Sequence, residues 1–214
     1  MSNALRSNIV LTGPAGVGKS SVGQRIATLT GRELLDIGAE IAAAHGKVHE
    51  LPEAQRLEIE RKLVADAAPK RNLVIATTPA TLLDQDNIVA LLGAEVFHLS
   101  ASTDTLVERV TADGIAMRPQ LAEADDLADE IERLAGERSE DYERFTTVDT
   151  SGMSLEQTID ALRKAGAPIE DPTAIAATQA TSAGGMDATT RIYAFVIAAA
   201  LAVLVVLFVL ILSF

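Results

Sequence analysis

The sequence contains a glycine-rich segment, TGPAGVGKSS at residues 12–21, whose residue types suit the binding of a nucleotide's phosphates. Gly13, Gly18, Lys19 and Ser20 satisfy the spacing G-x-x-x-x-G-K-S/T. Glycines let the backbone curl so that its N–H groups point at phosphate oxygens, and a following helix N-terminus adds positive charge. The lysine would reach the β and γ phosphates, while the serine hydroxyl would hold Mg²⁺. We therefore predict that ATP and Mg²⁺ are the cofactors. The predicted phosphate-binding residues are Gly13, Pro14, Ala15, Gly16, Val17, Gly18, Lys19, Ser20 and Ser21.

Short apolar runs alternate with helical patterns on both sides of this loop. Runs typical of strands buried on both faces occur at 8–12, 33–36, 72–77, 95–99 and 145–149. Between them, apolar residues recur at helical spacing, as in Val22, Ile26 and Leu29 directly after the loop. A last helix is expected behind the capping pair Ser154 and Gln157. The pattern predicts an α/β domain over residues 1–164, a doubly wound, parallel, five-stranded sheet with helices on both faces.

Four segments of this domain together resemble one known family. They read IVLTGPAGVGKSSVGQRIA, LLDIGAEI, DTLVERV with RPQL after it, and LAGERSEDYERFTTVDTSGMSLEQTIDAL, in order from about residue 7 to residue 163. They are similar to the shikimate kinases. The resemblance implies that Arg118, in an Arg-Pro pair, belongs to a lid that closes over the phosphates, and that Arg109 flanks the adenine. It also implies a place for Asp36 near the metal, so that Ser20 and Asp36 would be the metal-binding residues.

On the acceptor side the sequence departs from the family pattern. The family carries a second carboxylate two residues after the aspartate that Asp36 matches, and Gly38 stands there. Where the family has three glycines close to the substrate, this chain has Thr78, Pro79 and Ala80. Proline lacks an N–H and all three residues carry side chains, so close approach of the backbone is lost. We therefore expect shikimate itself to be a poor acceptor.

Two arginines match the family's carboxylate-binding positions. Arg56 and Arg138 would together grip the anionic group of a small carboxylate-bearing acceptor. The residues alone allow a second interpretation for each. Arg56 stands four residues before Glu60 and would pair with it on a helix surface, and Arg138 has acidic neighbours.

The composition of the chain and its C-terminal segment indicate which partners and which cellular location to expect. The net charge is −12, which argues against a nucleic-acid surface, and with no cysteine a disulfide framework is excluded. Residues 192–214 carry no charge and would span roughly 34 Å as a helix, enough for a bilayer core. We expect one C-terminal transmembrane helix as a tail anchor, a flexible linker over residues 165–191, and a cytoplasmic N-terminal domain in a single-pass membrane protein.

Two functions are compatible with these features. The first is an ATP-dependent small-molecule kinase of shikimate-kinase type, with Lys19, Asp36 and Arg118 as catalytic residues. The second is a nucleotide-binding accessory or regulatory subunit of a membrane complex without catalytic activity. The intact phosphate loop favours the first, and the apolar tail favours the second.

Overall fold

The computed structural model describes residues 7–46, 51–114, 121 and 124–170. Its contacts group Met1–Ile169 into one compact unit, and of the second unit, Glu170–Phe214, only Glu170 is described. The first unit is built around a parallel sheet with the strand order β2-β3-β1-β4-β5. The strands are β1 (Ile9–Thr12), β2 (Glu33–Asp36), β3 (Leu73–Ala76), β4 (Glu95–Ser100) and β5 (Thr146–Asp149). The prediction of a five-stranded parallel α/β domain is confirmed.

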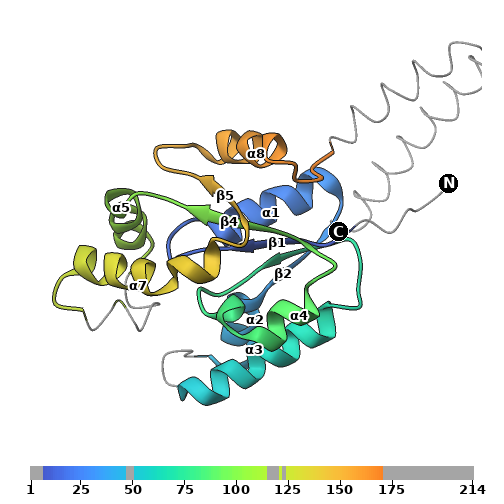
Figure 1. The fold of residues 1–214 in the computed structure, drawn as a ribbon, viewed down its shortest axis with the longest axis horizontal. Helices are drawn as coiled ribbons and strands as arrows, with labels where there is room; N and C mark the ends of the chain where they lie inside the picture. The colour runs from blue at the N-terminus through green and yellow to red at the C-terminus, as the bar shows by residue number, and fades with distance from the viewer. Residues whose placement is uncertain (1–6, 47–50, 115–120, 122–123, 171–214) are drawn as a thin grey trace, which may run out of the picture. The chain divides into compact units, whose positions relative to one another are not determined.

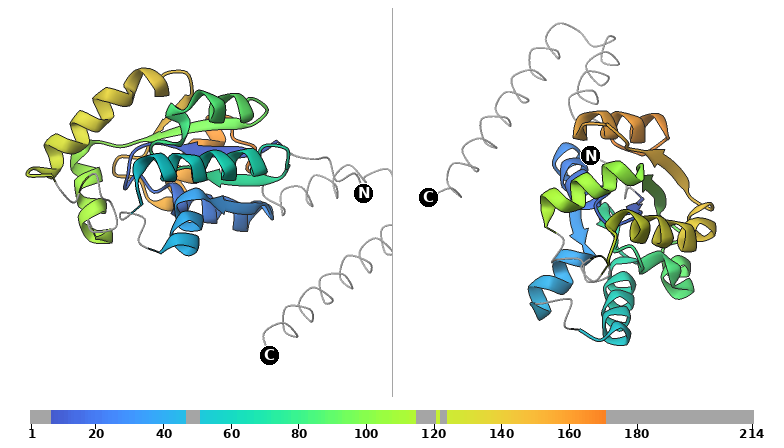
Figure 2. Two further views of the ribbon diagram at one scale, coloured as in Figure 1. Left: turned by 90° about the horizontal axis from the view of Figure 1, so that it is seen from below. Right: turned by 90° about the vertical axis from the view of Figure 1, so that its left-hand side faces the viewer.

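Helices cover both faces of the sheet (Figure 1). One face is covered by α1 (Lys19–Thr30) and α8 (Leu155–Lys164), and the other by α2 (Ile37–His45), α3 (Glu53–Ala67), the short 3₁₀ helix η2 (Thr81–Leu83) and α4 (Gln85–Ala90). Two further helices, α5 (Thr103–Asp113) and α7 (Leu127–Tyr142), pack against each other beside the carboxyl ends of the strands. Figure 2 shows the same arrangement along two other directions.

The alternation of side chains along the strands explains the two helical layers. All four residues of β1 are buried, and successive side chains point to opposite faces. Ile9 and Leu11 pack in one apolar cluster with residues of α1 and α8, whereas Val10 packs in a second cluster with residues of α2 and α3. A strand buried in this way has no exposed polar face, which is why its residues 9–11, Ile-Val-Leu, are continuously apolar.

Helix ends follow the predicted capping chemistry. At α8 the Ser154 side chain accepts from the Gln157 N–H while the Gln157 side chain accepts from the Ser154 N–H, so the expected capping box is present. The side chains of Ser102 and Asp126 cap α5 and α7 in a similar manner. These caps satisfy N–H groups that a helix leaves without internal partners.

The packed chain continues past α8. Ala167 and Ile169 are buried, and the backbone oxygen of Ile169 accepts a hydrogen bond from Arg163 Nε at 3.2 Å. The buried Arg32 donates to the backbone oxygens of Ser7 and Pro168. Because Ser7 lies two residues before the start of the first strand, the last described residues lie at the edge of the sheet where the strands begin (orange in Figure 1).

Within the part of the chain that the structure describes, no helix has the length and apolar character needed to cross a membrane. The predicted transmembrane segment, residues 192–214, lies outside the described residues, as does most of the predicted linker. Both stay predictions.

Candidate functional site

The phosphate loop joins β1 to α1, the setting that the motif requires. Gly13 and Gly16 have positive φ, 139° and 80°, and each comes very close to a neighbouring element. A Cβ on Gly13 would lie 2.2 Å from the Leu99 backbone oxygen in β4, and one on Gly16 would lie 2.5 Å from Val110 Cγ2 in α5. The glycines are therefore needed both for the curl of the loop and for its packing against β4 and α5.

Lys19, the first residue of α1, holds the loop from within. Its Nζ donates to the backbone oxygens of Gly13 and Pro14, both at 2.8 Å. This places the ammonium group across the loop, at the point where the amino-terminal end of α1 adds its own positive potential. A phosphate bound in the loop would replace these two carbonyl oxygens with negatively charged acceptors for the Lys19 ammonium group.

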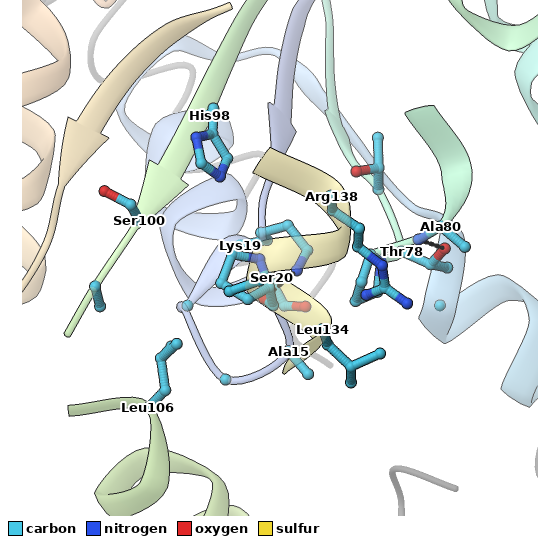
Figure 3. Close-up of a pocket in the computed structure, with 18 of the residues that line it drawn as sticks. Ala15, Lys19, Ser20, Thr78, Ala80, His98, Ser100, Leu106, Leu134 and Arg138 are labelled. Atoms are coloured by element: carbon cyan, nitrogen blue, oxygen red, sulfur yellow. Dashed lines mark hydrogen bonds between the residues drawn. The ribbon is translucent and has the colours of Figure 1, made fainter. Parts of the chain in front are cut away.

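A cavity of about 810 Å³ lies beside the loop. It brings together side chains from α1, the end of β2, α3 and α7 that are far apart in the sequence (Figure 3). The predicted site residues that line it are Pro14, Ala15, Gly16, Gly18, Lys19, Ser20, Ser21, Asp36, Arg56 and Arg138. Figure 3 shows Arg138 extending from α7 toward Thr78 on the acceptor side. Parallel α/β sheets commonly bind ligands at the carboxyl ends of their strands.

Ser20 and Asp36 supply oxygen ligands to this cavity. Asp36 ends β2 and caps α2, since its Oδ1 accepts from the Ala39 N–H at 3.0 Å. Among the described residues no group of three or more His, Cys, Asp or Glu side chains can hold a metal alone. A hydroxyl and a carboxylate nevertheless fit Mg²⁺, which keeps several waters and binds through few protein ligands together with substrate phosphates.

Arg109 ties the phosphate loop to a second loop. Its guanidinium donates to the backbone oxygen of Val17 at 3.3 Å, to Thr150 Oγ1 at 3.0 Å and to the Thr150 backbone oxygen at 3.0 Å. Arg109 is not among the described residues that line the cavity. The predicted adenine contact stays a prediction, and Arg118 lies outside the described residues.

The sequence analysis missed a polar cluster on the acceptor side. Glu60 of α3 is only 2% exposed, and its two oxygens accept from the hydroxyls of Thr78 and Thr81, each at 2.9 Å. Burial raises the pKa of Glu60 above its ordinary value, an effect partly offset by these two hydroxyls and by the charge of Arg56. In the sequence, the only sign of this cluster was the i, i+4 spacing of Arg56 and Glu60, which did not indicate that the two threonines take part.

An aromatic pair forms a further wall of the cavity. The rings of His98 in β4 and Tyr142 in α7 stack with centroids 4.3 Å apart, and the Tyr142 hydroxyl donates to the Pro79 backbone oxygen at 2.8 Å. Burial, and then the positive charge of Lys19, lowers the pKa of His98. His98 is therefore uncharged at neutral pH. Neither residue could be assigned to the site from spacing alone.

Comparison with known proteins assigns the family. A family model described as shikimate kinase matches residues 15–165. The chain belongs to the shikimate kinase family. The match covers nearly all of the segment that the sequence motifs had indicated, and membership makes an ATP-dependent phosphotransferase the expected class of enzyme.

Individual relatives agree with this assignment. The chain is 35% identical over 160 residues to a shikimate kinase of Pelotomaculum thermopropionicum, covering 72% of this chain and 91% of that protein. It is 30% identical over 164 residues to a shikimate kinase of Thermodesulfovibrio yellowstonii, covering 73% of this chain and 93% of that protein. Among solved structures, the fold is similar to that of shikimate kinase from Acinetobacter baumannii in complex with shikimate. That likeness has a TM-score of 0.68 at 24% identity and covers 74% of this chain and 92% of the other.

Proposed function

We propose that this protein transfers a phosphoryl group from Mg-ATP to the hydroxyl of a small compound that bears a carboxylate. The observation that carries the proposal is the composition of the cavity beside the phosphate loop. Lys19, Ser20 and Asp36 line its nucleotide side, while Arg56 and Arg138 enter it from α3 and α7. Two guanidiniums in one cavity suit an anionic group, and family membership supports phosphoryl transfer.

The roles of the residues follow from their positions. Lys19 and the N–H groups of the phosphate loop would stabilise the negative charge on the phosphoryl group during transfer. Ser20 and Asp36 would hold Mg²⁺, which neutralises charge between the β and γ phosphates when it is bound. Arg56 and Arg138 would orient the acceptor, so that its hydroxyl faces the γ phosphate. Positioning and electrostatics supply most of the rate of such reactions.

Shikimate is expected to be a poor acceptor within this function. Gly38 offers no carboxylate to hold hydroxyl groups, although its position has room for one, since a Cβ there would make only ordinary contact, 3.5 Å, with Asp36 Oδ1. We expect Gly38→Asp alone to leave shikimate turnover low, because Pro79 and Ala80 would still stand where a glycine backbone would approach the substrate.

The experiment that tests the proposed function measures ATP binding by calorimetry with and without Mg²⁺. Lys19→Ala should weaken Mg-ATP binding by about tenfold or more, because hydrogen bonds to charged groups contribute roughly 1.5–3 kcal/mol. Lys62→Ala, an exposed lysine on α3 that does not line the cavity, is the control and should bind normally. Equal affinities of Lys19→Ala and the parent would show that the loop does not bind phosphate.

Membrane anchoring by residues 192–214 is part of the proposal. It is supported by the absence of charge over a length that spans a bilayer core. Deleting these residues should move the protein from the membrane fraction to the soluble fraction on centrifugation of cell lysates. A protein that stayed in the membrane fraction after the deletion would need another anchor, such as a partner in a membrane complex.

A further inference from the structure

The loop that follows β3, residues 78–81 and here named the acceptor loop, uses its own backbone donors internally. The Thr78 N–H donates to Thr81 Oγ1 at 3.0 Å. The Ala80 N–H donates to Thr78 Oγ1 at 3.2 Å, as Figure 3 shows. Pro79 has no N–H. The Thr81 N–H points back to the Thr78 backbone oxygen at 3.4 Å. The acceptor loop therefore has no backbone N–H left for a bound molecule.

The hydroxyl groups of the acceptor loop are also engaged in hydrogen bonds. Each threonine hydroxyl has one proton, and Glu60 accepts from both hydroxyls, from Thr78 at Oε1 and from Thr81 at Oε2, while the two hydroxyl oxygens lie 3.0 Å apart. Glu60 and Thr81 are 2% and 0% exposed, and although Glu60 and Thr78 line the cavity, their polar side-chain atoms are hydrogen-bonded to one another. Even the Pro79 backbone oxygen accepts from Tyr142. The loop residues that line the cavity are Thr78, Pro79 and Ala80, and the one polar side chain among them, that of Thr78, is already bonded to Glu60.

We infer that Glu60, Thr78 and Thr81 form a closed polar network that leaves the acceptor loop without a free hydrogen-bond donor, and that this donor-poor wall selects the acceptor. The inference rests on the proposed function for the identification of the cavity as the acceptor site. The selected class is a compact monocarboxylate with one reactive hydroxyl and an otherwise apolar carbon frame. A hydroxyl oxygen placed against this wall would lose its hydrogen bonds from water without finding a free donor in the loop, which is unfavourable.

Two acids distinguish this class from hydroxyl-rich acceptors. Shikimate, a cyclohexene carboxylate, carries three hydroxyls, whereas 3-hydroxycyclohex-1-ene-1-carboxylate has the same ring, carboxylate and reactive hydroxyl without the other two. Binding of each acid to the full-length protein is measured by calorimetry in the presence of a non-hydrolysable ATP analogue and Mg²⁺. The monohydroxy acid should bind at least tenfold more tightly than shikimate.

Variants test whether the network causes this preference. Thr81→Val keeps the side-chain size but removes the hydroxyl, which releases the Thr78 N–H and one oxygen of Glu60. The preference for the monohydroxy acid over shikimate, measured as the ratio of the two affinities, should then fall at least threefold. Pro79→Ala supplies the missing N–H and should shift the ratio in the same direction, which keeps the test available if Thr81→Val does not fold. Thr158→Val is the matched control, because Thr158 is also buried but bonds only within α8 and does not line the cavity.

Each outcome decides the inference. Equal or tighter binding of shikimate by the parent protein would overturn it, as would failure of both acids to bind. A preference that persists unchanged in both Thr81→Val and Pro79→Ala would overturn the role of the network. The proposed function is judged separately, by formation of phosphorylated acid from ATP. Absence of that product with intact binding preference would reject phosphoryl transfer alone, whereas efficient transfer to shikimate would support transfer and reject selection by the donor-poor wall.

Discussion

The carboxylate of Glu60 interacts with Arg56 on its own helix and with two threonines of the acceptor loop. Arg56 stands one turn before it on α3, and its charge favours the ionised carboxylate, while Thr78 and Thr81 bind the two oxygens from the other side. The sequence allowed either a surface ion pair or a substrate-binding role for Arg56. In the structure Arg56 is half-buried, lines the cavity and interacts electrostatically with Glu60, so its charge is available to both.

Glu60 should give protein stability a particular pH dependence. Burial raises its pKa above the ordinary value of 4.5, so between pH 4.5 and the raised pKa the folded protein binds more protons than the unfolded chain. The free energy of unfolding therefore falls through this group as the pH rises across that window. Glu60→Gln has no proton to lose. We expect its urea-unfolding free energy, measured from pH 4.5 to pH 7, to decline less steeply than that of the parent.

The control for this prediction is Glu58→Gln, which changes an exposed glutamate on the same helix. It should leave the slope close to that of the parent. A Glu60→Gln protein whose stability varies with pH as the parent's does would show that the carboxyl titrates alike in folded and unfolded chains. Acidic groups with lowered pKa, such as Asp84 and Asp149, do not confuse the test, because they are present in the parent and in both variants and their contributions cancel in the comparison.

At the scale of elements, two loops act together through Arg109. The side chain leaves α5 and bonds to Val17 in the phosphate loop and to Thr150 after β5. Arg109→Met keeps much of the side-chain volume but removes these donors, so the two loops should separate. We expect affinity for Mg-ATP to fall by about tenfold, on the order of one lost hydrogen bond from a charged group. Fluorescence of a labelled nucleotide would measure it.

Arg144→Met is the control variant for Arg109→Met, because Arg144 is exposed. Among the interactions described, Arg144 pairs only with Asp141, one turn away. It should bind nucleotide like the parent. Unchanged nucleotide affinity in Arg109→Met would mean that the phosphate loop keeps its shape without the bridge, and that the predicted adenine contact is absent or weak.

Elements were more predictable than the contacts between them. The central strands β1 and β3 were visible as apolar runs because both of their faces are buried, whereas the edge strands β2 and β5 are more exposed and gave a weaker signal. The capping box of α8 was visible because it is local in sequence. The phosphate loop was equally predictable, because its glycines are required by the positive φ angles of the loop's own backbone. The network of Glu60 with Thr78 and Thr81 was not, because it joins α3 to a loop eighteen or more residues later, and threonines there look like ordinary turn residues.

At the scale of the whole molecule, the packed domain depends on residues after its last helix. Ile169 is 5% exposed, and Arg163 binds its backbone oxygen. A chain ending at residue 164 should therefore have a free energy of unfolding about 2 kcal/mol lower than one ending at residue 170, because burial of an isoleucine contributes roughly 1.5–3 kcal/mol. Urea denaturation of the two truncated proteins provides the measurement, and equal stabilities would contradict the packing described for Ile169.

The guanidinium of Arg32 holds the two ends of the described domain close together. Ser7 and Pro168 both bond to it, on the edge of the sheet opposite the phosphate loop. A short glycine-serine link could thus join residues 170 and 7, and the chain could be opened instead at the exposed turn around Leu92. Such a circular permutant would keep every wall of the cavity. The connectivity of this domain is therefore separable from its site.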